Sequence, residues 1–331
     1  MGRVDRPLPM ELAERPTPIP VETNAVAATN KPASWRDVEP KRLTSEQAET
    51  YVRENHRSAM SLLAASRTSG EKAYLREAME KYPNDPKVAF DAYFLAGPYD
   101  NKQPATPERR QWLENMKQSD PNNPLPNYLA ARDDFRAGKT DMALQELQAA
   151  SNKPAFNDYL LEALQTTEEA YRSAGFSEVD AKSTASWDLL LPHLSETKQL
   201  AENMADLAVQ YQKSGDASSA QSLIQMGLSL GQQVGGPGEF PLINTLVGIA
   251  IQKKLLSTMD PADPYLDTGT TIQDQINALN QYRESLKGLA PQTEAILPRL
   301  SDADRVNFYD RLRMFGEPAA IKWAAEKYGG Q

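Results

Sequence analysis

Two runs of apolar and small residues at helical spacing, separated by one glycine, restrict the fold of this chain more than any other feature. The runs are Met204, Leu207, Ala208 and Tyr211 before the glycine, and Ala220, Ile224 and Gly227 after it. Three-to-four spacing places side chains on one face of a helix. Gly215 and Asp216 between the runs are typical of a turn followed by a helix N-cap. The stretch 201–227 therefore predicts a helix hairpin whose small residues let the two axes approach closely.

Fainter copies of this hairpin occur earlier in the chain. Two copies share the spacing of three positions, which are Leu75, Ala78 and Pro83 in one and Leu113, Met116 and Pro121 in the other. A later copy has Ala131, Gly138, Ala143, Leu147 and Ala150 in the places of Ala208, Gly215, Ala220, Ile224 and Gly227. This comparison places four units, at 52–85, 86–123, 124–155 and 201–234. Because alternating β-branched runs are almost absent, the sequence predicts an all-α fold.

The four units resemble tetratricopeptide repeats, which are helix–turn–helix units of about 34 residues with small residues at the helix crossing and proline at the end. The tryptophan that is usual early in this repeat is replaced by Asn127 and Met204 in the two best units. The resemblance implies a right-handed superhelical array of hairpins, an α-solenoid, over 41–234.

The resemblance also implies which side chains line a concave groove, because the first helix of each unit faces it. These groove positions are Phe90, Phe94, Tyr128, Arg132, Phe135 and Arg136. Aromatic rings beside guanidinium groups suit a protein or peptide partner, since arginine pairs with carboxylates while rings cover apolar side chains. The alternative is that the rings fill the core between repeats and the arginines are solvated.

Three further segments complete the organisation. Residues 1–40 contain seven prolines without apolar periodicity, which predicts a disordered segment or tether. Such a tether favours a periplasmic or extracytoplasmic bacterial protein with an anchor preceding Met1, and a cytoplasmic location is the alternative. Residues 156–200 predict a helix pair that fits the repeat poorly but stacks like its neighbours. Residues 239–331 predict a helical region that packs on or caps the array, with helices at 240–258, 271–289, 302–314 and 317–328.

Composition excludes several kinds of site. The net charge of −9 disfavours nucleic acid and anionic lipid as partners, because both require a cationic surface. No apolar run is long enough for a transmembrane helix, so no membrane insertion is expected. The chain has no cysteine, which excludes disulfides, thiolate catalysis and cysteine-bound metals. The glycine-rich stretch 231–240 lacks the lysine of a phosphate-binding loop, so we expect neither a cofactor nor a metal.

Few residues suggest catalysis. His56 is expected on a first repeat helix and His193 at a helix end, and each is interpreted as structural or solvated. Asp260, Asp263 and Asp267 lack the spacing of a calcium loop and are better explained by proline turns and helix caps. Any two of the 45 carboxylates could approach to form a glycosidase-like pair, but no pattern selects one.

The sequence thus favours a non-enzymatic interaction or scaffold protein that binds a partner through a concave helical face. Two alternatives stay open. One is an α-helical hydrolase that acts on polysaccharide with a carboxylate pair. The other is a self-assembling structural protein that uses the apolar stripe of 271–289, and the oligomeric state is left open.

Overall fold

The computed structural model describes residues 41–97, 103–187, 191–236, 241–266 and 268–328. Within these ranges the regular structure is helical, and the only β-type contact is an isolated bridge between Pro264 and Thr271. The predicted all-α fold is confirmed. The proline-rich segment 1–40 lies outside the described residues.

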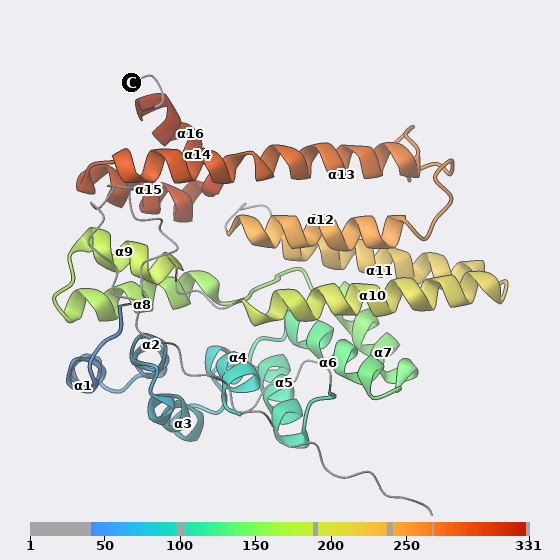
Figure 1. The fold of residues 1–331 in the computed structure, drawn as a ribbon. Coiled ribbons are helices and arrows are strands. Elements are labelled where there is room, and N and C mark those ends of the chain that lie inside the picture. Colours follow the sequence, from blue (N-terminus) through green and yellow to red (C-terminus); the bar gives the residue numbers. More distant parts are fainter. Residues whose placement is uncertain (1–40, 98–102, 188–190, 237–240, 267, 329–331) are drawn as a thin grey trace, which may run out of the picture.

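The helices follow one another closely along the chain (Figure 1). The first seven are α1 (Ser45–Glu54), α2 (Ala59–Ser69), α3 (Lys72–Lys81), α4 (Pro86–Leu95), α5 (Pro107–Ser119), α6 (Leu125–Arg136) and α7 (Thr140–Ser151). The middle five are α8 (Leu160–Ser173), α9 (Glu178–Trp187), α10 (Pro192–Lys213), α11 (Ala217–Gly235) and α12 (Leu242–Leu256). The last are α13 (Ile272–Lys287), α14 (Leu289–Ile296), the 3-10 turn η2 (Leu297–Arg299), α15 (Asp302–Phe315) and α16 (Glu317–Tyr328).

Local signals in the sequence explain where these helices begin and end. At the start of α1, Thr44 and Gln47 exchange backbone-to-side-chain hydrogen bonds of 3.0 and 3.2 Å, as a capping box does. Between α10 and α11, Gly215 has a φ of +82°, which glycine adopts without steric cost. The Asp216 side chain then accepts a 3.1 Å hydrogen bond from the Ser219 N–H. The predicted hairpin over 201–227 is confirmed.

The first row of the fold consists of three hairpins that pack in chain order. They are α2–α3, α4–α5 and α6–α7, with α3 against α4 and α5 against α6. These hairpins correspond to the three units predicted between residues 52 and 155. Figure 1 shows them along its lower half.

The chain then reverses, and this arrangement differs from the expected stacking. The pair α8–α9 does not continue beyond α7 but returns to the first hairpin, where α8 packs on α1 and α2. The Tyr171 hydroxyl donates to the Lys41 carbonyl at 2.7 Å, across this contact. Helices α10 and α11 instead lie on α6 and α7. The prediction that 156–200 stacks like its neighbours is therefore wrong, and a continuous superhelix is not confirmed.

A short polar segment explains the reversal. After α7 the chain passes the α5–α6 turn, where the fully buried Asn123 side chain holds it. Asn123 Nδ2 donates to the Asn157 carbonyl at 2.7 Å, and its Oδ1 accepts from the Asn157 N–H at 3.2 Å. Buried polar groups require such partners, so the side chain fixes the path of 153–159. Helix α8 therefore starts beside α4 instead of beyond α7.

Helices α8 to α11 thus form a second layer over the three hairpins of the first row. The C-terminal region extends this second layer. Helix α12 packs on α10 and α11, α13 packs on α12, and α15 packs on α9 (Figure 1). Helices α14 to α16 have a small core of their own around Phe308 and Ile321. The apolar stripe of α13, which the self-assembly alternative requires to be exposed, contacts α12 within the chain, where Ile272 and Leu286 are buried.

Candidate functional site

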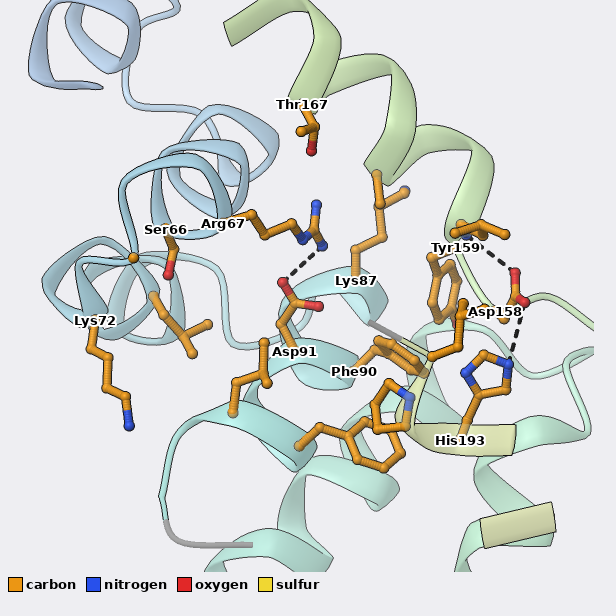
Figure 2. A pocket seen from close by; sticks show the side chains of 18 of the residues that line it. Ser66, Arg67, Lys72, Lys87, Phe90, Asp91, Asp158, Tyr159, Thr167 and His193 are labelled. Carbon is orange, nitrogen blue, oxygen red and sulfur yellow. Dashed lines mark hydrogen bonds and ion pairs between the residues drawn. The ribbon is translucent and has the colours of Figure 1, made fainter. Parts of the chain in front are cut away.

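A cavity of about 440 Å³ lies beside α4, between the α8–α9 pair and the start of α10 (Figure 2). The cavity exists because two parts of the second layer, the α8–α9 pair and the start of α10, leave α4 incompletely covered between them. Its apolar lining comes from α3, α4, α8, α9 and the segment that leads into α10. The apolar residues are Leu75, Phe90, Phe94, Leu95, Tyr159, Leu160, Ala163, Ala185, Leu191 and Pro192.

Phe90 occupies the centre of an aromatic wall in this cavity. Its ring centroid lies 5.1 Å from that of Phe94, 5.8 Å from that of Tyr159 and 5.9 Å from that of His193. All three contacts are edge-to-face, the arrangement in which the positive edge of one ring meets the negative face of another. Each such pair contributes about 0.5–1.5 kcal/mol beyond area burial. The wall is thus rigid and apolar, with one polar ring.

Cationic residues of α2, α3, α4 and the segment before α1 line the cavity. They are Arg42, Arg67, Lys72 and Lys87. Arg67 Nη2 donates to Asp91 Oδ2 at 2.7 Å, and the Asp91 side chain is buried. Arg67 Nη1 is buried without a hydrogen-bond partner among the described residues. A buried donor without a partner costs about 1–3 kcal/mol, so this atom is poised for an acceptor.

The other end of the cavity holds an acid–histidine pair. His193 Nε2 lies 3.3 Å from Asp158 Oδ2, and Figure 2 shows the contact as a dashed line. Asp158 also accepts hydrogen bonds of 3.2 Å from the Leu160 N–H and from Asn244 Nδ2. Burial alone would raise the pKa of Asp158, but its interaction with His193 and these two donors hold the pKa below its usual value. Asp158 is therefore a carboxylate at neutral pH.

The local backbone positions this pair. Tyr159, directly before α8, has a φ of +58°, which is uncommon for a residue with a side chain and turns the chain into the helix. Its hydroxyl donates to Asp120 Oδ2 at 2.9 Å, so the α5–α6 turn holds both Tyr159 and the neighbouring Asp158. His193 follows Pro192, the first residue of α10, and is only 1% exposed. Proline at a first helical position is favourable because its missing N–H would have no partner there.

The structure separates the six predicted groove residues into two groups. Phe90 and Phe94 line the cavity. The other four lie on α6, on the face that α10 and α11 of the same chain cover, and they are Tyr128, Arg132, Phe135 and Arg136. The Tyr128 hydroxyl donates to Gln233 Oε1 of α11 at 2.8 Å. Tyr128 and Arg132 are buried under these helices, whereas Phe135 and Arg136 are half-buried, and the role of all four in binding stays a prediction.

Arg132 belongs to a buried ionic network between α4, α6 and α10. It is 1% exposed and forms ion pairs with Asp133, at 2.5 Å, and with Glu196 of α10. The Tyr93 hydroxyl of α4 donates to Asp133 Oδ2 at 2.9 Å. Burial lowers the pKa of Arg132, although Tyr93 and Asp133 oppose this. Such a network restricts how α10 sits on α6, since each charge requires its partners.

The other residues that the sequence analysis weighed for catalysis or metal binding lie in turns or outside the described residues. His56 is not on a helix but in the exposed turn after α1, with a φ of +56°. Asp260 accepts a 2.9 Å hydrogen bond from the Ala262 N–H, as expected of a turn residue. Asp267 and residues 237–240 of the glycine-rich stretch lie outside the described residues. Throughout the described ranges no group of three or more metal-ligating side chains occurs. No helix of the described chain is long and apolar enough to cross a membrane.

Most of the cavity was not apparent from the sequence. The resemblance indicates Phe90 and Phe94, whereas no pattern in the sequence indicates Arg67, Lys87 or Asp158. For His193 the sequence offers only its residue type and an expected position at a helix end. Pro192 is the signal that indicates a helix start there, and a helix that starts at Pro192 puts His193 in its first turn.

Comparisons of the chain with models of protein families, with curated protein sequences and with solved structures found no match.

Proposed function

We propose that this chain is a non-enzymatic binding protein that holds a short segment of a partner protein in the cavity beside α4. The observation that carries the proposal is the rigid wall around Phe90, which faces an open cavity of about 440 Å³. Cavities of about 300–1,000 Å³ with apolar walls and a few polar groups are typical of ligand sites. Aromatic pockets of this kind also hold the anchor residues of protein partners.

The proposal retains part of what the tetratricopeptide resemblance implies. The three hairpins of the first row would act as repeat-like units, with the first helix of the middle unit, α4, presenting Phe90 and Phe94 to the partner. The partner would then contact a cavity closed by the second layer and not an open concave groove. This arrangement supports a peptide segment as ligand more than a large flat surface.

The acids of the cavity favour binding over hydrolysis. A glycosidase-like pair needs one carboxyl group that keeps its proton and a second one nearby. Asp91 is paired with Arg67, and the pKa of Asp158 lies below its usual value. Asp158 is therefore not suited to donate a proton at neutral pH, and Asp91 is engaged by Arg67, which weakens the alternative of a carboxylate-pair hydrolase.

Selection from a library of random short peptides displayed on phage tests the proposal. Ala163 is half-buried and lines the cavity, so Ala163→Trp fills the site. Ser222→Trp adds the same ring at an exposed position on α11, in a separate surface groove, and is the control. We expect selected peptides whose binding Ala163→Trp weakens more than about tenfold, while Ser222→Trp leaves it within about twofold. Peptides that bind the parent and Ala163→Trp equally well, with both proteins folded by circular dichroism, would overturn the proposal.

A further inference from the structure

Charge is unevenly distributed in the cavity beside α4. Among its described lining residues, three cations other than the outward-pointing Lys72 stand against two carboxylates, although the whole chain carries a net charge of −9. The cations are Arg42, Arg67 and Lys87, and the carboxylates are Asp91 and Asp158. Both carboxylates already have partners within the chain, namely Arg67 and His193. Among the lining residues that the structure describes, the excess positive charge therefore has no carboxylate counterpart, and an anionic group of a ligand would supply one.

Arg67 and Lys87 are the cations best placed to receive that anion. Figure 2 shows both side chains extending into the same part of the cavity, from α2 and α4 toward α8. Asp91 binds one nitrogen of the Arg67 guanidinium and so fixes its plane, while Nη1 keeps its hydrogens without a partner among the described residues. A guanidinium held in this way presents a directed donor to a carboxylate oxygen. Lys72, by contrast, points away from the cavity in Figure 2.

His193 supplies a second polar contact, as a hydrogen-bond acceptor where Arg67 and Lys87 are donors. The ring is 1% exposed, and its Nδ1 has no hydrogen-bond partner among the described residues. Figure 2 shows this nitrogen turned toward Phe90 and the cavity, while Nε2 faces Asp158. The Nε2 edge of the ring faces the Asp158 carboxylate, an acceptor, and so is the edge that offers a proton, while the lone pair of Nδ1 faces the cavity. We therefore assign Nδ1 as an acceptor, which requires a donor from the ligand.

From these contacts we propose that the site recognises an acidic peptide segment. A carboxylate of the peptide binds Arg67 and Lys87, an apolar side chain packs on Phe90, and a backbone N–H donates to His193 Nδ1. A simple aliphatic acid would pair with the cations and pack on the Phe90 ring, but it would offer no N–H to His193 Nδ1. The inference rests on the proposed function, because it names the chemistry of the segment that the same cavity holds.

The test uses the peptides selected from the displayed library, each synthesised in two forms, with a free and with an amidated C-terminus. We expect cavity-dependent peptides that share an acid beside a large apolar residue, and binding of the free-acid form only assigns the carboxylate to the C-terminus. Lys87→Gln is then combined with replacement of the peptide carboxylate by its amide. Each change alone should weaken binding about tenfold, and the two together should weaken it little more than either one, because they remove one interaction. Lys72→Gln, which removes the same charge from an outward-pointing side chain, should change affinity less than about twofold.

Methylation of each peptide backbone nitrogen in turn tests the second contact. One position should lose about tenfold in affinity for the parent but much less for His193→Gln, provided that the variant melts as the parent does. Two results would overturn the inference and leave the proposed function standing. One is cavity-dependent peptides without an acid, and the other is a combined loss of affinity for Lys87→Gln and the peptide amide that equals the full sum of the two separate losses. A selection without any cavity-dependent peptide would overturn both.

Discussion

Gly248 of α12 lies against Gly231 of α11 so closely that a Cβ atom added to Gly248 would stand 2.4 Å from the Gly231 carbonyl oxygen. The same atom would lie 2.7 Å from Cα of Gly235, one turn further along α11. These glycines bring two backbones into direct contact where α11 and α12 cross. The nearest neighbour of a Cβ added to Gly227 is Leu255 of α12, so the small residues of α11 serve this crossing as well as the one with α10.

Gly248→Ala should destabilise the protein by about 2–3 kcal/mol, because the backbone atoms that its methyl group would meet cannot move without separating the helices. Gly138→Ala is the control, since no atom lies within 4 Å of its added Cβ. Gly138 has a φ of +69°, so that change should cost about 1 kcal/mol through backbone strain alone. Urea unfolding of the two variants measures the difference. Equal losses would contradict the close crossing.

Asn123→Ala should cost about 2–4 kcal/mol, because it leaves the backbone groups of Asn157 and the Leu125 N–H without their buried partner. It should also loosen the segment that places Tyr159 in the cavity. Asn152→Ala removes an exposed amide that donates to the Gln148 carbonyl and should cost less than about 0.5 kcal/mol. Denaturant unfolding gives the stabilities, and hydrogen exchange at 153–160 should increase in the first variant only.

Lys182→Gln should weaken the attachment of α15 to α9. Lys182 is buried and forms ion pairs with Glu168, at 3.3 Å, and with Asp310 of α15. The substitution removes a cationic partner of the Glu168 carboxylate, and we expect the free energy of unfolding to fall by about 1–3 kcal/mol. Lys41→Gln removes a pair with Asp180 that is nearly half exposed and should cost less than about 1 kcal/mol.

Hydrogen exchange provides the measurement for this joint. Exchange in α15 should rise in Lys182→Gln and stay unchanged in Lys41→Gln. Unchanged exchange in both variants would mean that apolar contacts alone hold α15 in place.

The carboxyl group of Glu317 should make the stability of the folded protein depend on pH. Its carboxylate accepts a 3.2 Å hydrogen bond from the Leu242 N–H at the start of α12. Burial raises the pKa of Glu317, and this hydrogen bond opposes the rise only in part. The folded protein therefore holds the proton more tightly than the unfolded chain does. Stability from this group is complete below the ordinary glutamate pKa of 4.5 and falls as pH rises above it.

Glu317→Gln keeps an acceptor for the Leu242 N–H but removes the charge. The variant should therefore be more stable than the parent at about pH 7 and no more stable at about pH 4. Urea unfolding across this range measures the effect. A variant that is less stable than the parent at neutral pH would show that the charge of Glu317 stabilises the start of α12 more than burial destabilises it.

The helices themselves were largely predictable because their signals are local. The helix predicted at 302–314 is α15 (Asp302–Phe315), and that predicted at 317–328 is α16 (Glu317–Tyr328). Thr44, Gly215 and Asp216 perform the capping and turn roles that their residue types indicate. In each of these cases the relevant contact joins residues no more than four positions apart.

The candidate site was predictable only in part. Phe90 and Phe94 were selected from a repeat pattern, and both line the cavity. Arg67 gave no signal, because its role depends on Asp91, which lies 24 positions later on another helix. Asp158 and His193 meet only because the chain reverses after α7. No periodicity within a helix contains that information.

The sequence by itself determined that the chain is helical, where several of its helices begin and end, and which of them form the hairpins of the first row and of 201–227, since hydrogen bonds and apolar spacing within a few residues decide these features. The tertiary structure alone decided that α8 returns to α2 and that α10 covers α6. Those choices depend on contacts such as Asn123 with Asn157 and Arg132 with Glu196, which join residues far apart in the chain. The cavity beside α4 is the space that this second layer leaves open, so it appears only when both layers are in place.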